Sequence, residues 1–241
     1  MRARKSSHKS RGKESHAITA TLFALLLIAL CFWASHWQYA RGVARHHRNF
    51  IIASHVNQSI TTLDAIEPEI SGAEWRKVSM TGRFDQQHQI LLRNRYSQGV
   101  YGFDLLTLFT DTSARTFWVD RGWIAPGKSA TSIPALPVTS SKVVVLTGRI
   151  RLEDSLPQGS FFAINPGSKN LISKWNAQSN NSAKTENYYV DLLSASDPTM
   201  TPAVPVELPE LTDGPHMAYA LQWLFFAGLV GYGRLLLRRA R

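Results

Sequence analysis

Two long apolar stretches near opposite ends of the chain constrain its fold more than any other feature. Residues 17–34 (AITATLFALLLIALCFWA) and 217–237 (MAYALQWLFFAGLVGYGRLLL) contain one charged side chain between them, that of Arg234. A helix needs about 20 apolar residues to cross a bilayer core, and an arginine near a helix end can extend its side chain to the interface. The sequence therefore predicts two transmembrane helices in the lipid bilayer, with residues 35–216 together on one side of it.

Basic tails indicate which side that is. Residues 1–16 contain six lysines and arginines and one acid, Glu14, and residues 238–241 contain three arginines and no acid. Lysine and arginine next to spans mark the cytoplasmic side, so we expect a multi-pass protein with both tails cytoplasmic and an extracytoplasmic domain between them. The compact first tail favours a bacterial plasma membrane. In the alternative, a mitochondrial inner membrane, a longer presequence rich in arginine and serine is expected.

Charge and cysteine usage exclude several classes of protein. The formal net charge of +10 comes mostly from the two tails, and the central segment contains no basic stripe and no RNP-like or helix-turn-helix pattern. We therefore expect no nucleic-acid partner. Cys31 is the sole cysteine and lies in the first apolar stretch, so the central domain can form no disulfide and no thiolate metal site. No A-x-A cleavage site follows that stretch, which favours an uncleaved anchor over a signal peptide.

The central segment consists of short runs of β-branched and aromatic residues separated by turn residues, which is typical of strands. The predicted strands are residues 75–81, 88–95, 101–109, 115–124, 143–152 and 187–193. We further predict a helix over residues 45–70, a mobile insert over residues 169–186 and an extended segment over residues 202–209. The predicted fold is a membrane α+β protein, in which the two spans flank a mostly antiparallel β domain, either a barrel or a curled sheet.

No motif in the chain predicts catalysis. Residues 122–129 (GWIAPGKS) match the phosphate-loop pattern, but that loop requires a helix starting at its lysine, and Pro134 and Pro137 follow closely. We interpret this segment as a strand leading into a turn. The histidines lack the H-E-x-x-H spacing of zinc enzymes, and no serine lies in a G-x-S-x-G elbow. The sequence therefore predicts a protein that is not an enzyme.

Small residues four positions apart indicate where the spans touch. Ala20 and Ala24 have this spacing in the first span, as Ala227 and Gly231 have in the second. Such pairs allow two membrane helices to approach closely. Residues 25–28 are expected to be too bulky for such an approach.

Two clusters of aromatic and polar residues lie at the outer ends of the spans. His216, Tyr219 and Trp223 have spacings that share one face of a helix, and Trp37 and Arg41 share a face of the first helix if it continues outward. One interpretation is an aromatic belt at headgroup depth. The other is a haem site, in which an imidazole ligates iron, aromatic rings flank the macrocycle and an arginine pairs with propionates.

Three ordered motifs resemble the surfeit-locus family of cytochrome c oxidase assembly proteins. The family has G-x-W-Q-x-x-R after the first span, V-N-R-G-W-[IV] at the end of a strand, and N-H-x-x-Y-A-x-Q-W at the start of the second span. The matching residues are Trp37, Gln38 and Arg41; Val119, Arg121, Gly122, Trp123 and Ile124; and His216, Tyr219, Ala220, Gln222 and Trp223. The chain departs from these motifs at Ser35, Asp120 and Pro215. Order, spacing and the two-span layout cover almost the whole chain.

The resemblance implies an assembly factor for haem–copper oxidase that helps subunit I to mature and handles haem a, together with other oxidase assembly factors. It implies His216 as a candidate axial ligand of the haem iron, with Tyr219, Trp223, Trp37 and Arg41 around the cofactor. Two alternatives remain open at this point. One is a chaperone that holds subunit I without binding a cofactor, and the other is an unrelated membrane-anchored receptor or envelope protein with a β domain.

Overall fold

The computed structural model describes residues 7–128, 134–137, 139–152, 171–181 and 183–240, without the side chains of residues 7–16 and 171. The chain divides into two compact units, which we describe separately. The first consists of Met1–Ile51 and Glu210–Arg241, and the second of Ile52–Pro209. Residues 1–6 of the predicted basic tail lie outside the described residues.

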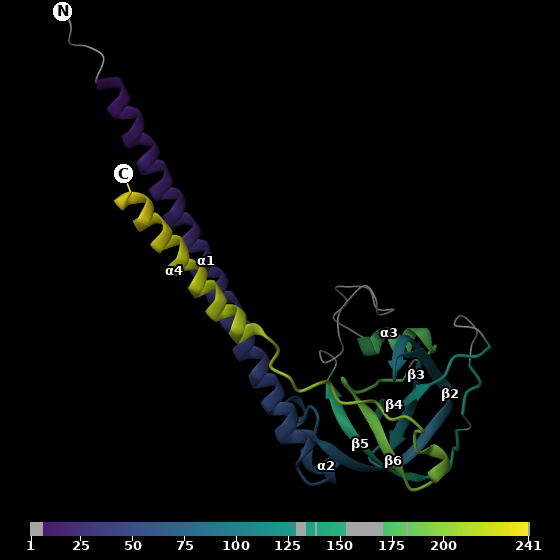
Figure 1. Ribbon diagram of the computed structural model, residues 1–241. Helices are drawn as coiled ribbons and strands as arrows, with labels where there is room; N and C mark the ends of the chain where they lie inside the picture. The colour runs from purple at the N-terminus through teal and green to yellow at the C-terminus, as the bar shows by residue number, and fades with distance from the viewer. Residues whose placement is uncertain (1–6, 129–133, 138, 153–170, 182, 241) are drawn as a thin grey trace, which may run out of the picture. The chain divides into compact units, whose positions relative to one another are not determined.

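Two long helices make up the first unit. Helix α1 runs unbroken over Ser7–Val56, and helix α4 covers His216–Arg239 (Figure 1). Both are long and apolar enough to cross a membrane, with mean hydropathies of 2.4 and 1.4 in their most apolar windows. Part of the helix predicted over residues 45–70 is therefore a continuation of the first span. The prediction is wrong for residues 57–62, where α1 has ended and strand β1 forms, and residues 63–70 are a separate short helix, α2, followed by a 3-10 turn.

The two helices pack antiparallel along a seam of mostly small residues. On α1 these residues are spaced alternately three and four apart, which is the period of a coiled-coil seam: Ala24, Ile28, Cys31, Ser35, Gln38 and Gly42. On α4 the seam includes His216, Ala220, Ala227, Gly231 and Arg234. At one end Arg234 donates to the backbone oxygen of Ala17 at 2.8 Å, and at the other His216 contacts Gln38.

The predicted contact between small residues is confirmed in part. Ala24 and Ala227 are buried, and a Cβ at Gly231 would lie 3.9 Å from Ile28 Cδ1. Ala20, in contrast, is exposed. Residues 25–28, expected to be too bulky for close backbone approach, include Ile28, whose side chain faces Gly231.

Replacing Gly231 by leucine should weaken the helix pair, because the new side chain overlaps Ile28 and overpacking costs about 1–3 kcal/mol. The measurement is the yield of a disulfide between Ser35→Cys and Ala220→Cys in a Cys31→Ala background. Gly233→Leu is the matched control, since a Cβ at Gly233 meets nothing within 4 Å. Equal yields in the two variants would contradict this packing.

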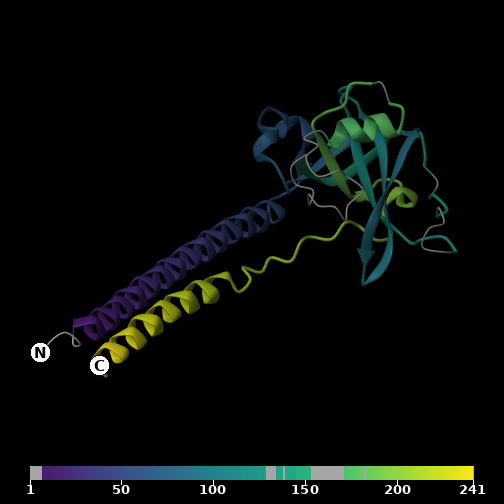
Figure 2. The ribbon, with the colours of Figure 1, turned by 90° about the horizontal axis from the view of Figure 1, so that it is seen from above.

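The second unit contains a closed five-stranded barrel. Its strands are β2 (Lys77–Ser97), β3 (Val100–Asp111), β4 (Thr116–Ile124), β5 (Val144–Leu152) and β6 (Tyr188–Ala195). They pair in the order β2-β3-β4-β6-β5, and β5 pairs with β2 again to close the ring (Figure 2). The two-residue strand β1 (Thr61–Thr62) adds to β2, and the short helices are α2 (Leu63–Ile66), α3 (Leu171–Gln178) and the 3-10 turns Glu67–Gly72 and Pro198–Met200.

The sheet is mixed: it is mostly antiparallel, as predicted, but not wholly so. The pairs β4–β6 and β1–β2 are parallel, and the other pairs are antiparallel. A ring with an odd number of strands cannot alternate in direction all the way round, so closure of five strands requires at least one parallel pair.

The two strands predicted over residues 75–81 and 88–95 form one strand, β2. Gly82, predicted to end the first of them, lies inside β2 and pairs with both Val144 of β5 and Asp111 of β3. A Cβ at Gly82 would lie 2.2 Å from the backbone oxygen of Thr110, so only glycine allows the strands to approach this closely. The strand passes from one partner to the other at this residue.

Alternate residues of the strands serve two cores. Side chains on one face, such as Phe109, Phe117 and Val190, form the main core of the barrel. The opposite face of β3, β4 and β6 carries a second cluster, which α3 covers with Ile172 and Trp175. The prediction of a mobile insert over residues 169–186 is therefore wrong for residues 171–178, whose two buried apolar side chains anchor a helix; residues 169, 170 and 182 lie outside the described ranges.

Candidate functional site

The site predicted at the start of the second span centres on His216, the first residue of α4. Gly214 has a φ of +66°, which favours glycine, and Pro215 has no N–H and stands at the N-cap. These two residues turn the chain into the helix at His216. The imidazole is half-buried, and its Nδ1 lies 2.9 Å from Oε1 of Gln38 on α1.

The bond to Gln38 determines which imidazole nitrogen is available. An amide oxygen only accepts, so Nδ1 of His216 carries the proton and donates it, and Nε2 keeps its lone pair. Histidines that ligate metals have this arrangement, in which the second nitrogen donates to an oxygen that orients the ring. Gln38 is therefore a positioning residue for His216.

Two further residues of α1 bring the helices together at this level. The Ser35 hydroxyl is buried and donates to the backbone oxygen of Ala220 at 2.9 Å. Gly42 is also buried, and a Cβ there would lie 3.2 Å from Sδ of Met217 and 3.4 Å from Cβ of His216. Ser35 and Gly42 were not among the predicted site residues, although Ser35, Gln38 and Gly42 follow the spacing of the seam.

The other predicted site residues lie beside the seam. Arg41 stacks over the ring of Trp37 on its own helix, with 5.1 Å from Cζ to the ring centroid. Tyr219 and Trp223 are 46% and 36% exposed on α4, and the ring of Trp223 packs edge-on against Phe226. Among the residues that the structure describes, no hydrogen bond or ring contact joins Trp37 or Arg41 to α4.

Helical phase nevertheless places these groups on one flank of the pair. Arg41 directly precedes the seam residue Gly42, and Tyr219 directly precedes the seam residue Ala220. In an antiparallel pair of helices, positions that precede the seam by the same angle face the same side. Trp37 lies one turn from Arg41. It also lies between Ser35, which contacts Ala220, and Gln38, which contacts His216, and so it is near the level of Tyr219. An aromatic and cationic surface thus borders His216 on this flank.

A polar cluster holds the segment that leads into α4. Asp213 accepts from Asn49 at 3.0 Å and contacts Nδ1 of His46 at 2.8 Å. Nε of Arg45 donates to the backbone oxygen of Thr212 at 2.6 Å. The bond from His46 lowers the pKa of Asp213. These contacts restrain Gly214 and Pro215, and therefore the position at which His216 enters the seam.

The motif Val119–Ile124 has a structural role in β4. Gly122 has a φ of +89°, and a Cβ there would lie 2.3 Å from the backbone oxygen of Val204. That oxygen accepts from the backbone N–H of Trp123 at 2.9 Å, so the extended segment around Val204 adds to the end of β4. Residues 122–124 are strand, as predicted, and Lys128 lies in a bend. Ser129 lies outside the described residues.

A buried charge cluster lies beside this motif. Asp120 of β4 pairs in register with Asp191 of β6, and Asp191 with Arg149 of β5. Asp191 accepts from Arg151 at 3.0 Å, and Asp104 pairs with Arg95 at 2.7 Å. Burial raises the pKa of Asp104 to about 6, against the pull of Arg95. Burial and the carboxylates of Asp104 and Asp191 raise the pKa of Asp120 well above its ordinary value.

The raised pKa of Asp120 bears on one departure from the family pattern, because it favours the neutral form of the carboxyl group. A neutral carboxyl has one donor and one acceptor oxygen, as the asparagine side chain of the pattern has donor and acceptor groups. Oδ1 of Asp120 accepts from the backbone N–H of Gly122 at 2.9 Å. A protonated aspartate can therefore replace asparagine at this position without leaving an additional buried charge.

The barrel should lose stability as the pH rises. A carboxyl with a raised folded-state pKa contributes stability that is present below the unfolded pKa and is lost as the pH rises through the folded pKa. For Asp104, between pH 3.8 and about 6, this corresponds to roughly 3 kcal/mol. Asp120 extends the loss to higher pH, so Asp120→Asn should flatten the profile.

The measurement is thermal unfolding of the full chain in detergent at pH 5 and pH 8, followed by circular dichroism. Asp197→Asn is the control, because Asp197 lies outside the buried charge cluster and its bonds with Thr199 lower its pKa. A melting temperature that falls equally in the wild type and in Asp120→Asn would contradict a protonated Asp120.

Comparison with known proteins identifies the family to which the chain belongs. The model of the SURF1 family matches residues 25–228, which include the end of the helix pair at His216 and Gln38 and the whole barrel. The chain is also 27% identical over 222 residues to uncharacterized SURF1-like proteins of Mycobacterium bovis and of two strains of Mycobacterium tuberculosis. These alignments cover 87% of this chain and 80% of each relative. Because the family model spans most of its length, the chain belongs to the SURF1 family.

Proposed function

We propose that this protein is an assembly factor for haem–copper (cytochrome c) oxidase that assists the maturation of subunit I by binding or delivering haem a. Family membership supports the assembly role and removes the alternative of an unrelated receptor. The observation that carries the haem role is the bond between His216 and Gln38, which leaves Nε2 of a half-buried imidazole with its lone pair at the outer end of the helix pair.

The residues around His216 fit a haem as cargo. His216 would hold the iron through Nε2, and haem a as cargo would supply redox-active iron to the oxidase. Tyr219 and Trp223 offer aromatic surface on the flank that borders the seam. Arg41, on the same flank, would pair with a propionate that is costly to bring near the membrane without a cation. The chain acts here by holding and orienting, so no catalytic residue is proposed.

The same bond also supports a second candidate. A histidine at a helix interface needs a polar partner, and Gln38 satisfies His216 without any cofactor. In this case the protein is a chaperone that holds subunit I, and the seam serves only to keep α4 in place. The two candidates differ in whether haem a accompanies the purified protein.

His216→Ala should reduce bound haem a to background, because it removes the iron ligand. Gln38→Leu should reduce it several-fold, since the imidazole then loses its orientation. Arg41→Ala should have a smaller effect, because it removes only a charge partner. The measurement is the haem a content of the full chain purified from cells that make haem a, at matched membrane levels and with co-purification of oxidase subunit I recorded. His47→Ala is the control, because His47 is an exposed histidine on α1, the helix that also carries Gln38 and Arg41.

Equal haem content in the wild type and His216→Ala would overturn the haem role. Retained co-purification of subunit I would then favour the chaperone. Loss of both signals in His216→Ala, with normal membrane insertion, would show that the helix pair itself recruits subunit I.

We further propose that the protein lies in a bacterial plasma membrane with both termini cytoplasmic and the barrel outside. Reporters fused to either terminus should be active only in the cytoplasm, because basic residues flank both spans on that side. A reporter inserted after Gly99 should be active only outside. That turn is exposed and a Cβ at Gly99 meets nothing, whereas an insertion near Ala177 would interrupt α3. Cytoplasmic activity of the Gly99 reporter would contradict this topology.

A further inference from the structure

One stretch of β2 has an unpaired edge. The strand pairs with β5 only over Lys77–Gly82, and beyond that it pairs with β3 alone. Over residues 89–93, the described part of the chain contains no backbone hydrogen bond outside the ladder with β3. Their remaining N–H and C=O groups therefore face outward along an edge, in a barrel whose strands are otherwise joined into a ring.

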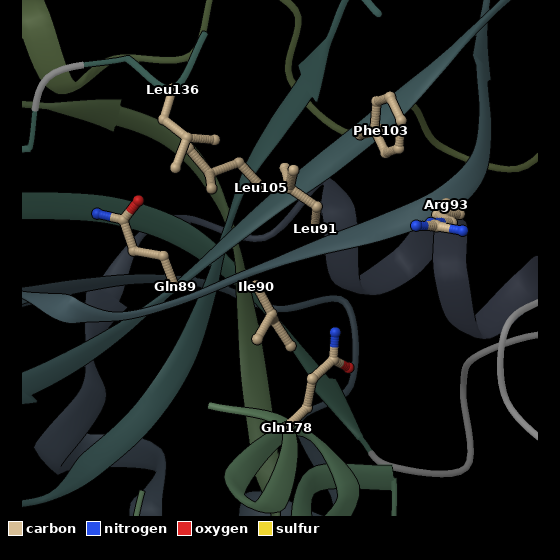
Figure 3. Close-up of a pocket in the computed structure, with 8 residues that line it drawn as sticks. All are labelled: Gln89, Ile90, Leu91, Arg93, Phe103, Leu105, Leu136 and Gln178. Carbon is tan, nitrogen blue, oxygen red and sulfur yellow. The ribbon is translucent and has the colours of Figure 1, made fainter. Parts of the chain in front are cut away.

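A cavity of about 290 Å³ follows this edge. Leu91, Leu105 and Leu136 gather on one side of the strand, and Ile90 and Gln178 lie on the other (Figure 3). The cavity therefore opens to both faces of β2. Its volume is at the lower limit of sites for small molecules, which start near 300 Å³, so it suits one or two side chains better than a large cofactor.

These two features together match the way in which an extended peptide adds to a sheet. In strand addition the peptide backbone pairs with the free edge, and its alternate side chains enter pockets on the two faces. Arg93, at the end of the cavity, is exposed and has no ion-pair partner in the described ranges. A carboxylate on the peptide would complement it.

We propose that the edge of β2 at residues 89–93 binds an extended segment of another polypeptide, with apolar side chains at alternate positions and an acidic residue facing Arg93. A second copy of this chain is a poorer occupant, because antiparallel pairing of two such edges around Leu91 would place Gln89 of the other copy opposite Arg93, and Gln89 offers no carboxylate to complement the arginine. The site is separate from His216 and goes beyond the function proposed above.

The test uses the full chain in nanodiscs and a display library of ten-residue peptides. The tightest binders should share alternating apolar residues and an acidic position. N-methylation of the selected peptide at every second residue should abolish binding, while methylation of the residues between should leave it intact, because only one set of N–H groups faces the edge. Amide hydrogens of residues 89–93 should exchange more slowly in the complex.

Variants test the charge. Arg93→Glu should weaken the binding of an acidic peptide by at least about fivefold, the effect of roughly 1 kcal/mol. A lysine in place of the acidic residue of the peptide should restore binding to this variant. Arg83→Glu, an exposed arginine on the same strand but away from the cavity, is the control, and His216→Ala should bind the peptide like the wild type. Binding that tolerates N-methylation at all positions, self-association through this edge, or a library without binders would each overturn the proposal.

Discussion

The close approach of two helices at Ser35, Gln38 and Gly42 is the contact on which the candidate site depends. Without it α1 and α4 would be independent helices, and His216 would have no oriented partner. Apolar surface gives little drive for association inside lipid, so membrane helices associate through small residues and hydrogen bonds across the interface. This pair uses both, with Gly42 allowing the backbones to approach and Ser35 and Gln38 each crossing to α4.

The barrel follows from different constraints. Five strands can close only with a parallel pair, and here that pair is β4–β6. Beside this pair, Asp120 and Asp191 are forced into adjacent positions on two parallel strands, with Arg149 and Arg151 on the next strand. A buried cluster of this kind is costly unless its members are paired or neutral. The arginines compensate Asp191, and burial beside two other carboxylates raises the pKa of Asp120, which favours its neutral form.

The sequence allowed the two helices, most strands and the family to be predicted, because each has a local signal. Apolar length identified the spans, and turn residues such as those around Gly99 identified the hairpin between β2 and β3. The continuation of β2 through Gly82 was missed, since a glycine that permits close contact resembles one that ends a strand. Helix α3 was missed because only Ile172 and Trp175 among its largely polar residues reveal its buried face.

The candidate site was predictable only in part for a related reason. His216, Tyr219 and Trp223 share a helix face that can be read from spacing alone. The partner of His216 depends on how α1 is rotated against α4, which is a tertiary property. Arg41 was expected to share a helix face with Trp37, and it stacks on that ring one turn away on its own helix. The spacing of residues predicts which of them share a helix face. Only the packing of the two helices decides which of them contact the other helix.

The bond between Gln38 and His216 joins residues 178 positions apart, and this separation has a consequence for biosynthesis. During synthesis α1 is complete long before α4 emerges, and the whole barrel lies between them in the chain. Distant contacts bear the entropy of closing a long loop, so a folded barrel, which shortens that loop, favours docking of α4. The seam can therefore form only after α4 has been synthesised, and a chain truncated or arrested before that point carries no complete site.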